Sequence, residues 1–323
     1  MKKVYFVTGG TGFIGSAIVK KLSEEGHSIV VLDNDWRGNA RRLSGLKGDI
    51  DIINADIRDS NSVCEASKNA DSIIHLAYVN GTENFYQSPD LVMDVAVRGM
   101  LSIVDACQKN NVKEFVLASS SEVYQSPNII PTNESVQVVV PDIYNPRYSY
   151  GGGKIACELM TTNMVSKLVD KTLIFRPHNV YGPDMGFEHV IPQLAMKLIQ
   201  IKHFESSKDE VKILGSGEQT RAFCYIDDFI QGVHLLLTQS SPSGLYHIGT
   251  PSETSIMNLC KLMMSRLGLD LRVKTSVAPK GETDRRVPDV SKIKQLGFKP
   301  AVNLDQGLEK TIPWYQEYCL QNK

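Results

Sequence analysis

The sequence has no long hydrophobic run and no excess of charge of either sign. Its longest apolar stretches, such as Phe115–Ala118, are far shorter than the roughly 20 residues of a membrane-spanning helix. Lys and Arg total 35 against 36 Asp and Glu, which gives a net charge of −1. There is no basic stripe of the kind that binds nucleic acid. We therefore expect neither a membrane span nor a nucleic-acid partner.

Cysteine is also sparse. The six cysteines lie far apart in the chain, at Cys64, Cys107, Cys157, Cys224, Cys260 and Cys319. They form no CxxC pair and no histidine stands at ligand spacing, so we expect reduced thiols and no metal site. The chain begins Met-Lys-Lys, as a secretory signal does, but Thr8–Thr11 interrupt the apolar run and no cleavage site follows. The expected location is the cytoplasm.

With 323 residues, of which 42% are hydrophobic, the chain can bury a sizeable core. In its first half, short apolar strands alternate with amphipathic helices. The predicted strands are Val4–Val7, Ser28–Leu32, Ile50–Asn54, Ser72–Leu76, Phe115–Ser119 and Lys171–Phe175. Strand–helix–strand units at this spacing predict an α/β fold with a Rossmann-type, doubly wound parallel sheet.

The first strand runs into the pattern GxxGxxG at the start of a helix. Backbone N–H groups there can bind a pyrophosphate, because the helix dipole favours negative charge. Gly9 permits the tight turn, Gly12 lets the pyrophosphate approach, and Gly15 lets the helix pack on the strand. Asp33, which ends the second strand, would accept hydrogen bonds from the adenosine ribose, and this favours NAD over NADP.

Neighbouring residues complete the predicted NAD site. Asp56 and Ile57 follow the third strand, where they could hold the adenine. Asp56 could instead cap the short helix that starts at Ser60. The other residues assigned to the cofactor loop are Phe13, Ile14 and Asn34.

After about residue 176 the alternation gives way to a mixed pattern with closely spaced prolines. We predict an NAD-binding domain over residues 1–176, rejoined by about 222–250. Residues 177–221 and 251–323 would form a smaller, mixed α/β lobe that binds the substrate.

The pattern YxxxK indicates a catalytic pair. Tyr150 and Lys154 share one face of a helix, so the ammonium can lie beside the phenol and lower its pKa. The segment Ser119–Tyr124 places hydroxyl groups at the carboxyl edge of the sheet, where ligands bind in such folds. Gly151–Gly153 cost helix stability, which indicates that a cofactor or another helix comes close to them.

Together these motifs resemble the extended short-chain dehydrogenase/reductase superfamily, and within it the NAD-dependent nucleotide-sugar epimerases and dehydratases. The motifs are TGGTGFIGS, His75-Leu76-Ala77, SSSEVY, YxxxK and RPHNVYGP. The resemblance runs nearly end to end, to Trp314-Tyr315. It implies that hydride passes from sugar C4 to NAD⁺, that Tyr150 takes the proton of the C4 hydroxyl, and that Ser120 shares this hydrogen bond.

The resemblance implies further contacts. Leu76, Ala77 and Tyr78 would line the cofactor, and Lys154 could hold the nicotinamide ribose. The residues implied to bind the nucleotide-diphosphate sugar are Ser121, His178, Asn179, His189, Val190, Ile191, Arg221, Arg285 and Arg286. The resemblance also implies a homodimer that packs through the helices Leu91–Lys109 and Tyr150–Ser166.

The step after oxidation is left open. A 4-epimerase needs only the Ser, Tyr and Lys residues, and this is the leading hypothesis. A 4,6-dehydratase also needs a base at C5 and an acid at the C6 hydroxyl. Glu122 can be the base, but Ser121 is a poor acid. The order hydroxyl-Ser-Glu also resembles that of uronate decarboxylases.

Two residues depart from the family pattern. Asp184 stands where decarboxylases tend to have Arg, and a carboxylate there would repel glucuronate. Ala96 stands where relatives commonly carry an Asn near the sugar. A hypothesis of another class is a non-catalytic NAD(H)-binding protein, against which the intact Ser120, Tyr150 and Lys154 argue.

Overall fold

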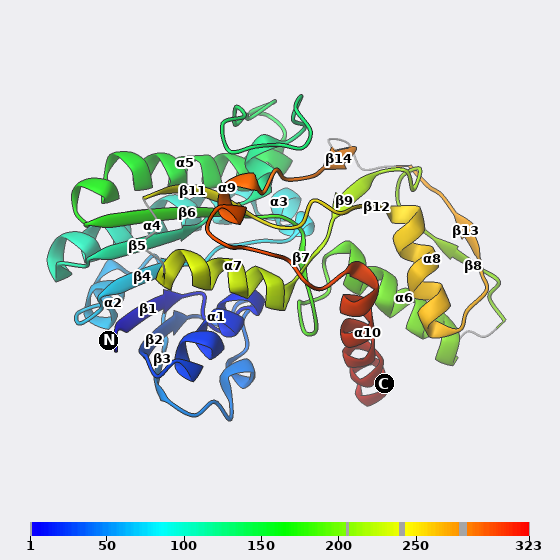
Figure 1. Ribbon diagram of the computed structural model, residues 1–323, viewed down its shortest axis with the longest axis horizontal. Helices are drawn as coiled ribbons and strands as arrows, with labels where there is room; N and C mark the ends of the chain where they lie inside the picture. The colour runs from blue at the N-terminus through cyan, green and yellow to red at the C-terminus, as the bar shows by residue number, and fades with distance from the viewer. Residues whose placement is uncertain (1, 205–206, 239–242, 278–282, 323) are drawn as a thin grey trace.

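The structure is a computed structural model that describes residues 2–204, 207–238, 243–277 and 283–322. Seven parallel strands form its central sheet in the order β11-β6-β5-β4-β1-β2-β3 (Figure 1). The bounds are β1 Val4–Thr8, β2 Ser28–Asp33, β3 Asp49–Asn54, β4 Ser72–His75, β5 Glu114–Ala118, β6 Lys171–Pro177 and β11 Gly244–Ile248. The strand order reverses between β1 and β4, which opens a crevice at the carboxyl ends of the strands. The predicted doubly wound parallel sheet is confirmed.

Two groups of helices flank this sheet. The bounds are α1 Phe13–Glu24, α2 Ser60–Ala66, α4 Pro89–Asn110, α5 Ser149–Asn163 and α7 Ile226–Thr238. α4 packs between α2 and α5, and α1 packs on α7. The buried side chains form two main cores, and successive residues of β1 alternate between them: Tyr5 and Val7 join the core of α1 and α7, and Phe6 joins that of α2, α4 and α5.

The carboxyl-terminal segments form a smaller lobe, on the right of Figure 1. Its elements are α6 Val190–Phe204, β8 Glu210–Lys212, β9 Thr220–Ala222, β12 Glu253–Ser255, α8 Ile256–Leu267, β13 Arg272–Lys274, β14 Arg285–Arg286 and α10 Leu304–Gln321. The remaining helices and strands are α3 Thr82–Gln87, β7 Val180–Tyr181, β10 Cys224–Tyr225 and α9 Ser291–Lys294. The sequence pattern left the region of α6 as mixed. Pro192 lies in the first turn of this helix, where a missing N–H is tolerated.

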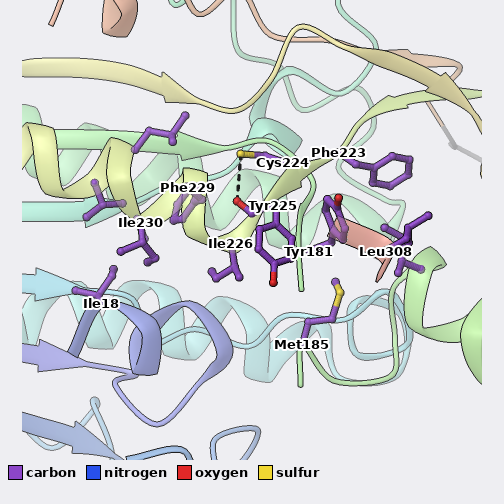
Figure 2. Packing of buried hydrophobic residues seen from close by; sticks show 14 of the residues in the cluster. Ile18, Tyr181, Met185, Phe223, Cys224, Tyr225, Ile226, Phe229, Ile230 and Leu308 are labelled. Atoms are coloured by element: carbon purple, nitrogen blue, oxygen red, sulfur yellow. Dashed lines mark hydrogen bonds between the residues drawn. The ribbon is translucent and has the colours of Figure 1, made fainter. Parts of the chain in front are cut away.

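One core continues from the sheet into the lobe. Figure 2 shows Phe229 and Ile230 of α7 in the same cluster as Tyr181 and Leu308 of α10. The ring of Tyr181 meets that of Tyr225 edge-on, with centroids 5.5 Å apart. This packing holds the segment that follows β6 between the sheet and the lobe.

All six cysteines are free, and all but Cys319 are buried. Among the described residues, no group of three or more His, Cys, Asp or Glu side chains is placed to hold a metal ion. No helix in the described part of the chain is both long and apolar enough to cross a membrane.

Candidate active site

A cleft of about 1290 Å³ runs along the carboxyl ends of the central strands and into the lobe. Its lining includes the loops after β1, β2, β4 and β5 on the sheet side. On the lobe side it includes residues from the segment after β6 and from α6, β9 and β14. The order reversal in the sheet therefore positions the cleft, as it does in other doubly wound folds.

The glycine-rich loop forms a cradle in this cleft. Gly9 has φ +72°, and a Cβ there would stand 2.6 Å from the backbone nitrogen of Ala77. A Cβ at Gly15 would collide with the carbonyl oxygen of Gly9. Gly12 is the N-cap of α1, and it caps the helix with no side-chain hydrogen bond. These features suit a pyrophosphate at the helix N-terminus, so the residues present fit a dinucleotide.

Asp33 lies beside the same loop. Its carboxylate accepts hydrogen bonds from the backbone nitrogens of Thr11 and Asp35, both at 3.0 Å. Gly38 makes this approach possible, because a Cβ there would collide with the Thr11 hydroxyl. The sequence analysis missed Gly38, although a glycine five residues after Asp33 was a visible signal. The other predicted residues of the cofactor loop that line the cleft are Phe13, Ile14 and Asn34.

Asp56 and Ile57 line the cleft, as do Leu76, Ala77 and Tyr78. The alternative role of Asp56 as a helix cap is wrong, because Asp59 caps α2 by accepting from the backbone nitrogens of Asn61 and Ser62. Asp56 is instead paired with Arg58, whose hydrogen bonds lower the pKa of Asp56.

The predicted catalytic residues meet in the middle of the cleft. Tyr150 near the start of α5 is buried, and Ser120 after β5 forms a hydrogen bond with it. Burial raises the pKa of Tyr150 to about 12, and the hydrogen bond of Ser120 only partly opposes this. The expected lowering of the Tyr150 pKa by Lys154 is therefore not what this structure shows, because desolvation outweighs it.

Lys154 lies one turn further along α5. Its ammonium donates a hydrogen bond to the carbonyl oxygen of Ala118 at 2.7 Å and stands 6.0 Å from the centroid of the Tyr150 ring. Burial lowers the pKa of Lys154 to about 8. Phe85 of α3 stacks on the Tyr150 ring, with centroids 4.8 Å apart, and was missed because α3 is too short to show a periodic pattern.

Glu122 lies in the cleft next to these residues. Its carboxylate accepts a hydrogen bond from Arg286 at 2.5 Å, and Arg147 approaches it at 3.8 Å. Burial alone would raise the pKa of Glu122, but Arg286, Arg147 and Arg221 outweigh it and the pKa is lowered. Arg147 was missed. Its place three residues before Tyr150, one helical turn away, is the signal that could have found it.

A family model describes this combination of loop and catalytic residues. The model of the "NAD dependent epimerase/dehydratase family" matches residues 5–249, three quarters of the chain. The chain belongs to this family. The predicted resemblance is therefore confirmed, and the protein is an NAD-dependent enzyme.

Relatives of this epimerase/dehydratase family member catalyse three different reactions. UDP-N-acetyl-alpha-D-glucosaminuronate decarboxylase from Bacillus cytotoxicus is 29% identical, over 98% of this chain and 99% of that protein. UDP-glucose 4-epimerase from Thermotoga maritima, solved with UDP-glucose, superposes with a TM-score of 0.86 at 25% identity, over 98% and 99% of the two chains. dTDP-glucose 4,6-dehydratase from Streptomyces venezuelae, solved with NAD, gives 0.84 at 26%, over 97% of each chain.

Most of the residues that the resemblance assigned to the substrate line the cleft of this family member. Those that do are Ser121, Asn179, His189, Val190, Ile191, Arg221 and Arg286. Asn179 has φ +42°, and its side chain donates to the carbonyl oxygen of Ala222 at 3.3 Å. His189 stays neutral, because burial and then Arg37 lower its pKa to about 4.

Two of the assigned residues lie outside the cleft lining. His178 is fully buried, and its ring meets that of His247 edge-on, with centroids 4.7 Å apart. Arg285 forms hydrogen bonds with Glu253 at 2.8 and 2.9 Å on the outside of the lobe. Arg285 and Arg286 are consecutive in β14, and consecutive strand residues point to opposite faces, so only one of them reaches the cleft.

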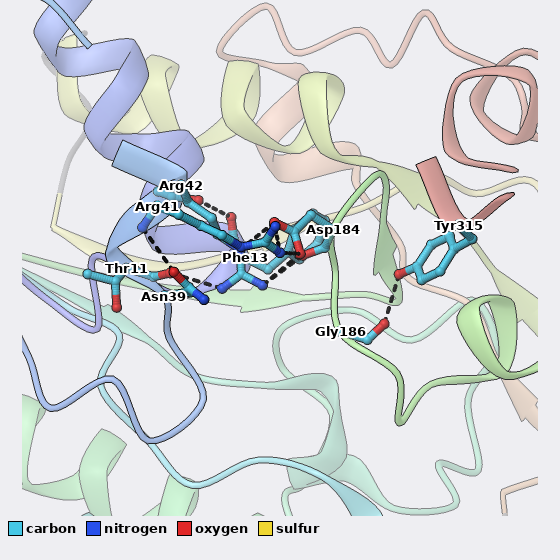
Figure 3. Close-up of polar contacts among 9 residues, drawn as sticks. Thr11, Phe13, Asn39, Arg41, Arg42, Asp184, Gly186 and Tyr315 are labelled. Carbon is cyan, nitrogen blue, oxygen red and sulfur yellow. Dashed lines mark hydrogen bonds and ion pairs between the residues drawn. The ribbon is translucent and has the colours of Figure 1, made fainter. Parts of the chain in front are cut away.

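Asp184 does not present an unpaired charge. Figure 3 shows its carboxylate between Arg41 and Arg42, which approach it at 3.0 to 3.1 Å. Arg42 also donates to the carbonyl oxygens of Thr11 and Asp184 at 3.0 Å. The expected repulsion of a glucuronate by Asp184 therefore loses its basis, because two guanidinium groups compensate the carboxylate.

Proposed function

We propose that this enzyme is a nucleotide-sugar 4-epimerase that oxidises the sugar at C4 and then returns the hydride. The observation that carries the proposal is the state of Glu122. The pairing with Arg286 and the lowered pKa make Glu122 a poor base, whereas the residues needed at C4 meet in the cleft. A complete C4 apparatus beside a weak C5 base supports epimerisation over dehydration.

In this proposal Tyr150 takes the proton of the C4 hydroxyl, and Ser120 holds that hydroxyl in line through a shared hydrogen bond. NAD, when bound, supplies the hydride acceptor. Because burial raises the Tyr150 pKa, proton transfer at neutral pH requires positive charge beside the phenol. Lys154 is the residue of α5 that can provide it.

The substrate end of the cleft suits an anion. Arg147, Arg221 and Arg286 line it and bring three positive charges near the single negative charge of Glu122. A nucleotide diphosphate supplies matching negative charge, and arginine binds phosphate oxygens through two parallel hydrogen bonds. We therefore assign the diphosphate of the sugar nucleotide to this arginine group.

Uronate decarboxylation is the second candidate, and the ion pairs of Asp184 favour it. With Asp184 compensated by Arg41 and Arg42, no unpaired carboxylate at this position opposes a uronate. Dehydration is less well supported, because it needs an acid at C6 and the neighbouring hydroxyl of Ser121 is a weak one.

The test is a panel of nucleotide sugars and nucleotide uronates incubated with the enzyme in heavy water and analysed by mass spectrometry. A new isomer of unchanged mass supports the 4-epimerase. Loss of carbon dioxide identifies a decarboxylase, and loss of water with one retained deuterium identifies a dehydratase. The matched variant is Glu122→Gln. It should leave epimerisation within about tenfold of the wild type, whereas a dehydratase should lose about 10²–10⁴-fold in kcat.

We also propose a homodimer that packs through α4 and α5. Met93, Val97 and Leu101 are spaced four residues apart on α4, and their side chains are 37%, 37% and 45% exposed. Leu159 adds an exposed apolar side chain on α5. A Val97→Arg variant should elute as a monomer if this face pairs with a second copy, and Leu320→Arg, on α10, is the control.

A further inference from the structure

Lys154 is a buried cation with an unusual set of neighbours. Among the described residues, none of the carboxylates forms an ion pair with it. Its two close contacts are the carbonyl oxygen of Ala118 at 2.7 Å and the face of the Tyr78 ring, whose centroid is 3.9 Å from the ammonium nitrogen. Because a buried ammonium without compensation tends to lose its proton, these two contacts decide whether Lys154 stays charged.

The Tyr78 ring is held by its own contacts. Its edge meets the Tyr150 ring at an interplanar angle of 84°, with centroids 5.2 Å apart. Its hydroxyl donates a long hydrogen bond of 3.4 Å to the carbonyl oxygen of Tyr150. Tyr78 therefore contacts both members of the Tyr150–Lys154 pair at once.

The structure leaves space for this ring at two small residues. A Cβ at Gly153 would collide with the Tyr78 hydroxyl and would stand 3.0 Å from the Cβ of Ala96. Gly153 is thus one of the α5 glycines whose need for a close neighbour is explained, and the neighbour is an aromatic ring of the protein. Ala96, which departs from the family pattern, bounds the same space.

We propose that Tyr78 is a positioning residue for the catalytic pair: its ring face keeps the Lys154 ammonium charged and its edge orients the Tyr150 phenol. The proposal rests on the role of Tyr150 and Lys154 in the proposed C4 oxidation. The negative face of an aromatic ring attracts a cation most strongly where water is excluded, as it is around Lys154.

Other groups around Lys154 do not replace this ring. The titratable groups that face it are Tyr78, Tyr150, Cys157, Glu158 and His75. Burial, with Lys154 as the next cause, lowers the pKa of His75 to about 3, so this ring is neutral. Glu158 is paired with Arg176 at 2.5 Å, and burial raises the pKa of the Cys157 thiol to about 11.

The experiment titrates Lys154 directly in the protein without cofactor or substrate. Lysine labelled with carbon-13 at Cε is followed by NMR, and the Lys154 signal is assigned by its loss in Lys154→Met. In Tyr78→Leu we expect the pKa of Lys154 to fall by about one unit. In Tyr78→Phe, which keeps the ring face, the pKa should stay close to that of the wild type.

Phenylalanine and 3,4,5-trifluorophenylalanine at position 78 keep the shape of the ring while fluorine weakens its negative face. The Lys154 pKa should be lower with the fluorinated ring, and this comparison holds even if Tyr78→Leu fails to fold. Phe85→Leu is the matched control, because it removes the other ring beside Tyr150. It should leave the Lys154 pKa unchanged.

Activity supplies a second readout. In Tyr78→Leu the alkaline limb of kcat/KM should move to lower pH by about one unit, because Lys154 loses its charge earlier. Gly153→Ala should reduce kcat by displacing the phenol, and adding Tyr78→Phe, which removes the colliding hydroxyl, should restore it. An unchanged Lys154 pKa with both the fluorinated ring and Tyr78→Leu would overturn the proposal. The NMR titration needs no turnover, so its result is separate from whether the enzyme is an epimerase.

Discussion

The two ends of the cleft are built in different ways. At the cofactor end, the cradle consists of backbone groups within one strand–loop–helix unit, supported by Asp33 from the next strand. At the substrate end, Glu122 is paired with Arg286, which is 164 residues away in the chain. The comparison teaches that a site made of local backbone geometry can be found in a sequence, whereas a site made of charges from distant segments cannot.

The largest expected effect separates the chemistry from the cofactor end. Tyr150→Phe removes the proton acceptor but keeps the ring that stacks on Phe85. We expect kcat to fall by about 10³-fold with the substrate that the panel identifies. NAD affinity, measured by isothermal titration calorimetry, should stay within a few-fold of the wild type. Retained turnover would mean that another group takes the proton.

The cofactor end can be broken by one methyl group. In Gly15→Ala the new Cβ would collide with the carbonyl oxygen of Gly9, which should cost about 1–3 kcal/mol of unfolding free energy and weaken NAD binding. Gly152→Ala is the matched control, because a Cβ there meets only a Val140 methyl group at 3.5 Å. Denaturant unfolding and NAD titration measure both. Equal effects in the two variants would contradict the cradle.

The link between the two ends should contribute less. Asp184→Asn removes the charge that Arg41 and Arg42 share, while Asn still tolerates the observed φ of +56°. We expect a loss of about 2 kcal/mol in unfolding free energy, and added salt should reduce the difference from the wild type. Thermal unfolding at two ionic strengths measures this. A difference that does not respond to salt would mean that packing, not charge, is responsible.

The smallest effect is a pH dependence inside the sheet. His75 is buried against the Thr8 hydroxyl at 2.7 Å, and burial lowers its pKa from 6.5 to about 3. Below pH 6.5 the unfolded chain binds a proton that the folded His75 does not, so stability falls as the pH drops from about 6.5 toward 3. His75→Asn should make this pH dependence shallower, as followed by denaturant unfolding at a series of pH values. An identical slope in both proteins would assign the dependence to other groups.

Much of the cofactor end was predictable from the sequence. The glycine spacing and the Asp33 position were visible because each lies within one βαβ unit, and Tyr150 and Lys154 were visible because a helix places residues four apart on one face. The division into an NAD-binding domain and a substrate lobe stays a prediction, as do the roles of the individual site residues. The Tyr150 pKa was misjudged because burial cannot be read from a motif.

The substrate end was predictable only in part. Arg285 and Arg286 could not be told apart, because the face that a strand residue occupies depends on how β14 pairs with β9. His178 was assigned to the sugar, yet it packs on His247 behind the cleft. Asp184 was read as an unpaired charge because its partners, Arg41 and Arg42, belong to a segment more than 140 residues earlier.

The sequence by itself determined the sheet, the glycine cradle and the identity of the Ser120, Tyr150 and Lys154 group, because periodicity and short spacings encode them locally. Only the tertiary structure decided which charges compensate one another, which side chains reach the cleft and what fills the space at Gly153. These outcomes depend on contacts between segments far apart in the chain, and on burial, which sets the pKa of each group only after the chain has folded.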